Sequence, residues 1–209
     1  SNDLTSRLAA LGIPVVNFNR GQDDPLLAEV TSDNLAGARR ATEFLIAGGH
    51  RRIAHVMGWQ GASTGRDRAE GFRQAMAAAG LAPGPMIDGM YDRAAAVAAT
   101  RRMFDGGDPP DAIFVGNDHM AFAVMDELRF GMGLSVPQDV SVIGYDDVPM
   151  AAWPAYDLTT LRQPVNRMVE ATVEAITGLI DGTSGVEKIR IDGPLMIRGS
   201  ARIPEGATE

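Results

Sequence analysis

The 209-residue chain contains no cysteine, and only 6% of its residues are aromatic. The absence of cysteine excludes disulfide bonds, thiolate metal sites and a cysteine nucleophile. No apolar run approaches the ~18 residues that a membrane-spanning helix needs. The first residues, SNDLTSRLAALG, lack the basic and hydrophobic segments of a secretory signal. We therefore expect no membrane segment and a cytoplasmic location.

The sequence also lacks the short motifs of common catalytic and cofactor sites. It has no GxSxG, no GxxxxGK[ST], and no GxGxxG after an apolar strand pattern. These absences weigh against a hydrolase and against nucleotide or dinucleotide binding. His50, His55 and His119 show no i, i+4 spacing, so no metal site is expected, and His55 fits a structural role inside an apolar strand. We expect neither a cofactor nor an enzymatic activity.

Positive charge is scarce, because the formal net charge is −8. Nucleic-acid binding depends on clustered Lys and Arg, and the tight clusters here are three arginine pairs, 39–40, 51–52 and 101–102. We interpret each pair as a solvated helix or turn surface. Composition therefore argues against direct contact between this chain and DNA.

Short apolar segments alternate with amphipathic ones along most of the chain. This alternation is typical of βαβ units and a parallel sheet, and thus of an α/β fold. The predicted strands are Ile13–Phe18, Ile53–Met57, Met86–Gly89, Ala112–Val115 and Val140–Tyr145. The predicted helices are Leu4–Leu11, Asp33–Ala47, Asp67–Ala79, Ala94–Phe104, Asp118–Phe130 and Val165–Asp181. Asp33 is expected to cap its helix through its side chain.

The last part of the chain has a different pattern. Two further short strands are predicted at Glu187–Ile191 and Leu195–Ile197. The helix before them, Val165–Asp181, carries an apolar stripe at helical spacing. The stripe consists of Met168, Val169, Val173, Ile176 and Ile180. The residues from Glu205 onward are predicted to be a frayed tail.

Polar side chains occur where predicted strands pass into helices. They are Arg68, the pair Asn117 and Asp118, and the pair Asp146 and Asp147. Ligands of open α/β sheets bind beyond the carboxyl ends of the strands. A guanidinium, a carboxamide and a carboxylate together offer both donors and acceptors. Such a set suits a polyhydroxylated ligand such as a sugar.

Each of these residues also has a purely structural interpretation. Asn117 or Asp118 could cap the following helix, with Asp118 the better candidate. Arg68 could be a surface residue paired with Glu70 or Asp67. Asp146 and Asp147 do not suit a two-carboxylate catalytic site, because adjacent residues of an extended chain point to opposite sides.

The few aromatic residues also lie near predicted strand ends. Trp59 follows Met57 closely, Tyr91 follows the strand at Met86–Gly89, and Trp153 precedes a proline. An aromatic ring in such a place can stack on the apolar face of a sugar, although core packing is the usual role of tryptophan. Tyr91 is the strongest aromatic candidate.

Six segments, taken together, resemble the effector-binding domain of lactose-repressor-family transcription regulators. The resemblance is colinear from about Leu4 to Ala201. The segments are DNLAGARRATEFLIAGGHRRIAHV (33–56), RAEGF (68–72), DAIFVGNDHMAF (111–122), VPQDVSVIGYDD (136–147), AAWPAYDLTTLRQP (151–164) and IRGSA (197–201).

The resemblance implies a fold like that of the type I periplasmic binding proteins. In that fold two doubly wound parallel-sheet lobes, joined by three crossovers, hold a ligand in the cleft between them. It implies a first lobe from residues 1–31 and 164–192, incomplete here. The second lobe would comprise residues 32–163 and 193–203, followed by a tail at 204–209. The crossovers are expected near Ser32, Gln163 and Gly193.

By the same resemblance, Arg68, Asn117 and Asp146 contact the effector, and Tyr91 and Trp59 are aromatic candidates beside it. Asn19 stands where the family often has an aspartate. The implied function is sensing of a small molecule, a sugar or sugar derivative, by a homodimeric regulator. Operator DNA would be bound through an N-terminal headpiece that this sequence does not include. A transport-type sugar-binding protein is the alternative.

Overall fold

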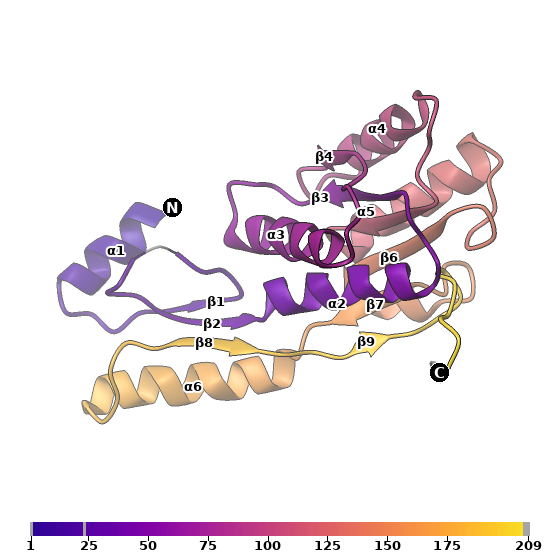
Figure 1. Ribbon diagram of the computed structural model, residues 1–209. Coiled ribbons are helices and arrows are strands. Elements are labelled where there is room, and N and C mark those ends of the chain that lie inside the picture. The colour runs from indigo at the N-terminus through magenta and orange to yellow at the C-terminus, as the bar shows by residue number, and fades with distance from the viewer. Residues whose placement is uncertain (1, 23, 207–209) are drawn as a thin grey trace.

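The computed structural model describes residues 2–22 and 24–206 and has an α/β fold with two sheets (Figure 1). The smaller sheet is parallel throughout, in the order β1-β2-β8. Its strands are β1 (Val16–Phe18), β2 (Ala28–Ser32) and β8 (Lys188–Ile191). Helices α1 (Asn2–Ala10) and α6 (Val165–Asp181) lie at the same end of the molecule (Figure 1).

The larger sheet has six strands in the order β4-β3-β5-β6-β7-β9, and β9 runs antiparallel to β7 while the other pairs are parallel. These strands are β3 (Ile53–Met57), β4 (Met86–Asp88), β5 (Ala112–Val115), β6 (Ser141–Asp146), β7 (Thr159–Arg162) and β9 (Leu195–Met196). Its helices are α2 (Asn34–Ala47), α3 (Ser63–Ala78), α4 (Arg93–Phe104), α5 (Asp118–Asp126), the π-helix η1 (Glu127–Gly131) and the 3-10 helix η2 (Pro149–Ala152).

Helices cover both faces of the larger sheet, and two apolar clusters fill the space between the layers. Successive strand residues point to opposite faces. Accordingly Ile113 belongs to the cluster with α4 and α5, whereas Phe114 belongs to the cluster with α2 and α3. Phe72 of α3 is fully buried in the second cluster. Burial of a side chain of this size contributes roughly 1.5–3 kcal/mol.

Several predicted boundaries agree with the structure, and two strands were missed. β3, β5 and α6 have the predicted bounds, and Asp33 caps α2 by accepting from the Ala36 N–H at 3.0 Å. β2 and β7 were not predicted as strands, because each is short and half polar. Glu29 of β2 is nevertheless buried, beside Lys188 Nζ at 3.5 Å.

Three other elements differ in detail from the predictions. Helix α3 begins at Ser63 instead of Asp67, so Arg68 lies in its second turn. The helix predicted to run to Phe130 ends at Asp126 and continues as the π-helix η1. On α6, Met168 is buried but Val169, Val173 and Ile180 are exposed, so the predicted apolar stripe is only partly covered by the described residues.

The chain passes between the two sheets three times. It leaves β2 for α2, returns from β7 to α6, and crosses again between β8 and β9. Backbone hydrogen bonds tie these crossovers together. Asp33 N donates to Ile191 O, and Arg162 N donates to Pro194 O, each at 2.9 Å. No helix in the described part of the chain is long and apolar enough to span a membrane.

Candidate ligand-binding site

The carboxyl ends of β3, β5 and β6 meet at one edge of the larger sheet. The parallel register pairs Val56 with Val115 and Phe114 with Ile143, so these strands end side by side. Trp59 and Asn117 lie in the segments after β3 and β5, and Asp146 is the last residue of β6. This edge is where an open α/β sheet presents side chains to a ligand.

Arg68 of α3 points into this edge and is only 3% exposed. Its Nε donates to Asn34 Oδ1 at 2.8 Å, and its Nη1 donates to Gly116 O at 2.5 Å. The guanidinium carbon lies 3.6 Å from the centroid of the Tyr145 ring. A surface pairing with Glu70 or Asp67 is therefore wrong for Arg68. Two hydrogen bonds and the contact with the Tyr145 ring fix this buried guanidinium in one orientation.

Asp146 ends β6 and faces Arg68. Its Oδ1 accepts from Gln163 Nε2 at 2.6 Å and lies 3.5 Å from Arg68 Nη2. The side chain is 22% exposed, so it retains access to a ligand. The backbone of Asp146 has φ 122, a conformation that L-residues rarely adopt. Such a backbone costs of the order of 1–3 kcal/mol and is concentrated at functional sites in proteins.

Asp147 turns away from this cluster, although the backbone here is not extended, since Asp146 and Asp147 have φ 122 and 58. It is 5% exposed and forms ion pairs with Arg162 at 2.6 Å and Arg198 at 2.7 Å. These pairs connect the end of β6 to the end of β7 and to the segment after β9. Asp147 therefore has a structural role, and the two carboxylates do not converge on a common point.

Asn117, and not Asp118, caps helix α5. Asn117 Oδ1 accepts from Met120 N at 3.0 Å, so the preference for Asp118 as the cap was wrong. Asp118 is fully buried and accepts from Thr160 Oγ1 at 2.6 Å and Val148 N at 2.9 Å. Burial raises the pKa of Asp118 to about 7. The amide nitrogen of Asn117 forms no described hydrogen bond.

Tyr91 lies beside the start of α3. Its hydroxyl is 3.1 Å from Thr64 Oγ1, and its ring packs so tightly on Gly58 that a Cβ there would overlap it. Tyr91 has φ 57, so its backbone is also in the left-handed region. The partly buried ring contacts the core below. Tyr91 therefore lines the edge of the sheet next to the end of β3.

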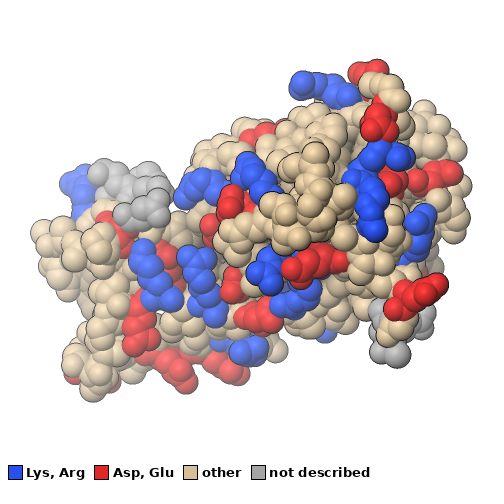
Figure 2. All heavy atoms as spheres, in the orientation of Figure 1, with Lys and Arg blue, Asp and Glu red and all other residues tan. Residues whose placement is uncertain are grey.

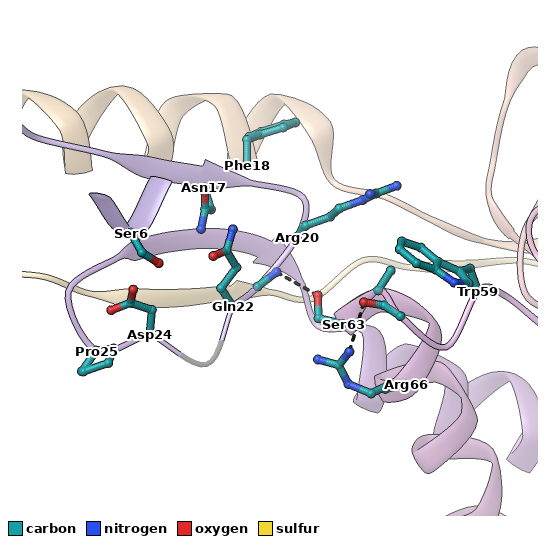
Figure 3. A pocket seen from close by; sticks show the side chains of 13 residues that line it. Ser6, Asn17, Phe18, Arg20, Gln22, Asp24, Pro25, Trp59, Ser63 and Arg66 are labelled. Atoms are coloured by element: carbon teal, nitrogen blue, oxygen red, sulfur yellow. Dashed lines mark hydrogen bonds between the residues drawn. The ribbon is translucent and has the colours of Figure 1, made fainter. Parts of the chain in front are cut away.

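Trp59 and Asn19 lie farther toward the smaller sheet. Trp59 is 44% exposed and lines a cavity of about 880 Å³ between the loop after β1 and the start of α3 (Figure 3). Asn19 follows β1 with φ 62, and its Oδ1 is buried without a hydrogen-bond partner. The structure thus brings Arg68, Asp146 and the Gly116–Asn117 turn together. Asn19 forms no described contact with that cluster.

Four residues around the site were not predicted from the sequence. Asn34 and Tyr145 hold Arg68, Gln163 holds Asp146, and Thr64 contacts Tyr91. Gln163 could have been found, because it lies at a predicted crossover. Asn34 and Thr64 carry no comparable signal, since their roles depend on contacts between distant segments.

The histidines do not form a metal site. His55 is fully buried, stacks on Phe114 with 4.6 Å between ring centroids, and has Nδ1 2.9 Å from Phe114 O. Burial lowers the pKa of His55 to about 4. Among residues 2–22 and 24–206, no group of three or more His, Asp or Glu side chains is placed to hold a metal ion. His55 therefore has the predicted structural role.

Comparison with known proteins identifies the fold of this chain. The family model described as "Periplasmic binding protein-like domain" matches residues 42–201. The LacI transcriptional regulator from Rhodococcus species has a TM-score of 0.88 and 32% identity, with 96% of this chain and 75% of that chain covered. The fold is therefore that of a periplasmic-binding-protein-like, two-sheet ligand-binding module.

Two further relatives define the family more closely. The probable HTH-type transcriptional repressor ExuR of Bacillus subtilis is 30% identical over 207 residues, which cover 96% of this chain and 61% of the relative. The CelR–cellobiose complex has a TM-score of 0.80 and 29% identity, with 95% of this chain and 69% of that chain covered. This chain belongs to the LacI family of transcription regulators and corresponds to their effector-binding part. It spans about three fifths of the length of the curated relative.

Proposed function

We propose that this chain is the sugar-sensing part of a bacterial transcription regulator. The effector binds at the carboxyl edge of the larger sheet, in a cleft closed by the smaller sheet. Residues 1–31 and 164–192 contribute the first lobe, and residues 32–163 and 193–203 the second. Arg68, Asn117 and Asp146 bind the hydroxyl groups, with Tyr91 and Trp59 beside the sugar ring and Asn19 on the opposite lobe.

The paired geometry of Arg68 and Asp146 is the observation that supports this proposal most strongly. A buried guanidinium and a partly exposed carboxylate share one opening, and both are held by other protein groups. A vicinal diol can donate to the carboxylate and accept from the guanidinium at the same time. Because both groups are already fixed, little entropy is lost when a sugar binds.

Regulation is favoured over transport. The cited relatives are transcription regulators, and one is a complex with cellobiose. In a regulator of this kind the effector shifts the equilibrium between two arrangements of the lobes. It can do so only if it binds one arrangement more tightly. The output would be operator affinity of a DNA-binding headpiece outside this sequence, in the cytoplasm.

Homodimerisation is part of the proposal. Phe130 is 85% exposed and Trp153 is 56% exposed. The segments that carry them are adjacent, because Arg129 Nη1 donates to Ala155 O at 2.6 Å. Exposed aromatic side chains on neighbouring segments are typical of protein interfaces. Sedimentation velocity of the chain and of a Phe130→Asp variant tests this part, since the variant is expected to be monomeric.

The binding site is tested by titrating a panel of sugars and following tryptophan fluorescence and heat. Asp146→Ala and Arg68→Ala should each weaken binding of the responding sugar by about 100-fold, because each leaves a buried polar partner unpaired. Asp108→Ala and Arg73→Ala, at exposed positions, are the matched controls. Circular dichroism establishes that each variant is folded. Unchanged affinity in both folded site variants would contradict the assignment.

A further inference from the structure

The cavity between the loop after β1 and the start of α3 has a marked division of charge. Its volume of about 880 Å³ is large enough for a sugar. Asp24, Ser6 and Pro25 lie at one end of it, and Arg20, Ser63 and Arg66 lie at the other (Figure 3). Two guanidinium groups at one end are notable in a chain with a net charge of −8.

The two arginines form no ion pair among the described residues. Arg66 Nη1 makes only long contacts, at 3.4 Å to Gln60 O and 3.3 Å to Gly61 O. Arg20 extends from the loop after β1 toward Trp59 (Figure 3) and forms no described ion pair. Elsewhere on the surface most arginines pair with Asp or Glu, and basic and acidic side chains alternate over the face in Figure 2. Asp67 interacts electrostatically with Arg66 but forms its ion pair with Arg190, so the charge of Arg66 is only partly balanced, and Arg20 has no ion-pair partner among the described residues.

At the acidic end of the cavity, other groups of the protein already donate hydrogen bonds to Asp24. Asp24 Oδ1 accepts from Leu26 N at 2.9 Å. A hydrogen bond from the Ser6 side chain, together with that from Leu26, lowers the pKa of Asp24. Asp24 therefore stays ionised and engaged with its own loop, and it repels an anion toward the other end of the cavity.

Ser63 adds a hydrogen-bond donor at the Arg20–Arg66 end of the cavity (Figure 3). Its Oγ accepts from Gly21 N at 2.8 Å, so its own hydrogen remains available to donate to an oxyanion.

The N-terminus of α3 adds positive potential and free N–H groups at the Arg20–Arg66 end of the cavity. Ala62 precedes this 16-residue helix and offers no side-chain cap. The first backbone N–H groups and the positive end of the helix dipole therefore remain without a side-chain acceptor. Trp59 lies over Gly61, where a Cβ would overlap the indole ring, and its exposed face is available to a sugar ring.

Resting on the proposed function, we propose that the effector is an acidic sugar, one that carries a carboxylate or phosphate. The anionic group binds at the Arg20–Arg66 end of this cavity. The sugar ring packs against Trp59, which lines the same cavity. A charged hydrogen bond of this kind is stronger than a neutral one, so Arg20 and Arg66 act as specificity-determining residues.

The experiment compares matched sugars by calorimetry with the whole chain. The probes are glucose, glucose 6-phosphate and glucuronate, with galactose, galactose 6-phosphate and galacturonate as a second series. We expect the acidic members of the responding series to bind at least about tenfold more tightly than the neutral member. Arg66→Gln and Arg20→Gln should each reduce that preference about tenfold. Arg73→Gln, an exposed arginine on the same helix, should leave it unchanged.

The outcomes separate this inference from the function on which it rests. Preference for the phosphate, for the uronate or for both supports it and identifies the source of the anion. Equal or tighter binding of the neutral sugars, or a preference that survives in both Arg20→Gln and Arg66→Gln, overturns it while sugar sensing stands. Binding of no sugar in either series contradicts both.

Discussion

Gln163 Nε2 donates to Asp146 Oδ1 at 2.6 Å and so connects a crossover between the sheets to the carboxylate of the candidate site. The same oxygen lies 3.5 Å from Arg68 Nη2. Gln163 lies between β7 and α6, where the chain returns to the smaller sheet. A ligand that draws Asp146 away from Gln163 therefore acts directly on a crossover. In the proposed function, this contact is the route by which the effector acts on the relative arrangement of the lobes.

Loss of the Gln163 side chain should weaken sugar binding without abolishing it. Gln163→Ala removes the donor that orients Asp146, so the affinity for the responding sugar should fall about tenfold. Gln74→Ala is the matched control, because Gln74 is exposed on α3 and contacts only Glu70 among the described side chains. Calorimetry measures both. An affinity equal to that of the unmodified chain would show that Asp146 needs no support from the crossover.

Removal of the charge of Asp147 should destabilise the fold. Asp147→Asn breaks two ion pairs and leaves Arg198, which is 14% exposed, without its carboxylate. We expect the free energy of unfolding to fall by about 2–4 kcal/mol. Asp108→Asn disrupts a pair whose carboxylate is 81% exposed and should cost less than about 1 kcal/mol. Denaturant unfolding distinguishes the two, and equal costs would contradict a structural role for Asp147.

Asp118 and His55 should have opposite effects on the pH dependence of stability. Asp118 has its pKa raised from 3.8 to about 7, so its contribution to stability falls as pH rises between these values. His55 has its pKa lowered from 6.5 to about 4, so its contribution rises with pH in that window. Each slope is about 1.4 kcal/mol per pH unit. Between about pH 4 and pH 6.5 the two contributions should largely cancel.

Asp118→Asn should remove the contribution of Asp118 to the pH dependence of stability and leave that of His55. Thr160 can turn its hydroxyl to accept from the new amide, so the variant is expected to fold. Its free energy of unfolding should then rise steadily from pH 4.5 to pH 6.5, whereas that of the unmodified chain changes little. Parallel urea titrations at several pH values measure this difference. Identical pH profiles for the two proteins would show that Asp118 does not titrate in this range.

The contact between α2 and α3 should not tolerate added volume at Gly71. A Cβ at this position would overlap Leu35 O, a backbone atom that cannot move alone. Gly71→Ala should therefore lower the free energy of unfolding by about 1–3 kcal/mol, despite the higher helix propensity of alanine. Gly107→Ala, where the space is open, is the control and should be nearly neutral. A stable Gly71→Ala variant would mean that the two helices separate easily.

The fold was largely predictable because local patterns agree with tertiary packing. β5 is wholly apolar and buried, β3 is apolar except for the buried His55, and the side chain of Asp33 caps α2. β2 was not predicted, since Glu29 in a buried strand is acceptable only with Lys188 nearby. Such a pairing joins residues that are far apart in the sequence.

The site was predictable in position and only partly in detail. Arg68 and Asp146 could be singled out because strand ends meet at one edge of a parallel sheet. Asn34 and Tyr145, which hold Arg68, could not, because their contacts depend on how α2 and β6 pack against α3. The preference for Asp118 as the cap was wrong for a similar reason. Thr160 and Val148 provide a buried place for its carboxylate that the sequence does not show.

The most direct test of sugar sensing by this chain is a crystal structure with the responding sugar bound. We predict that sugar hydroxyl groups lie within about 3.2 Å of both Arg68 and Asp146, at the carboxyl edge of the larger sheet. A sugar bound elsewhere, with Arg68 and Asp146 still in contact with protein groups alone, would contradict the account.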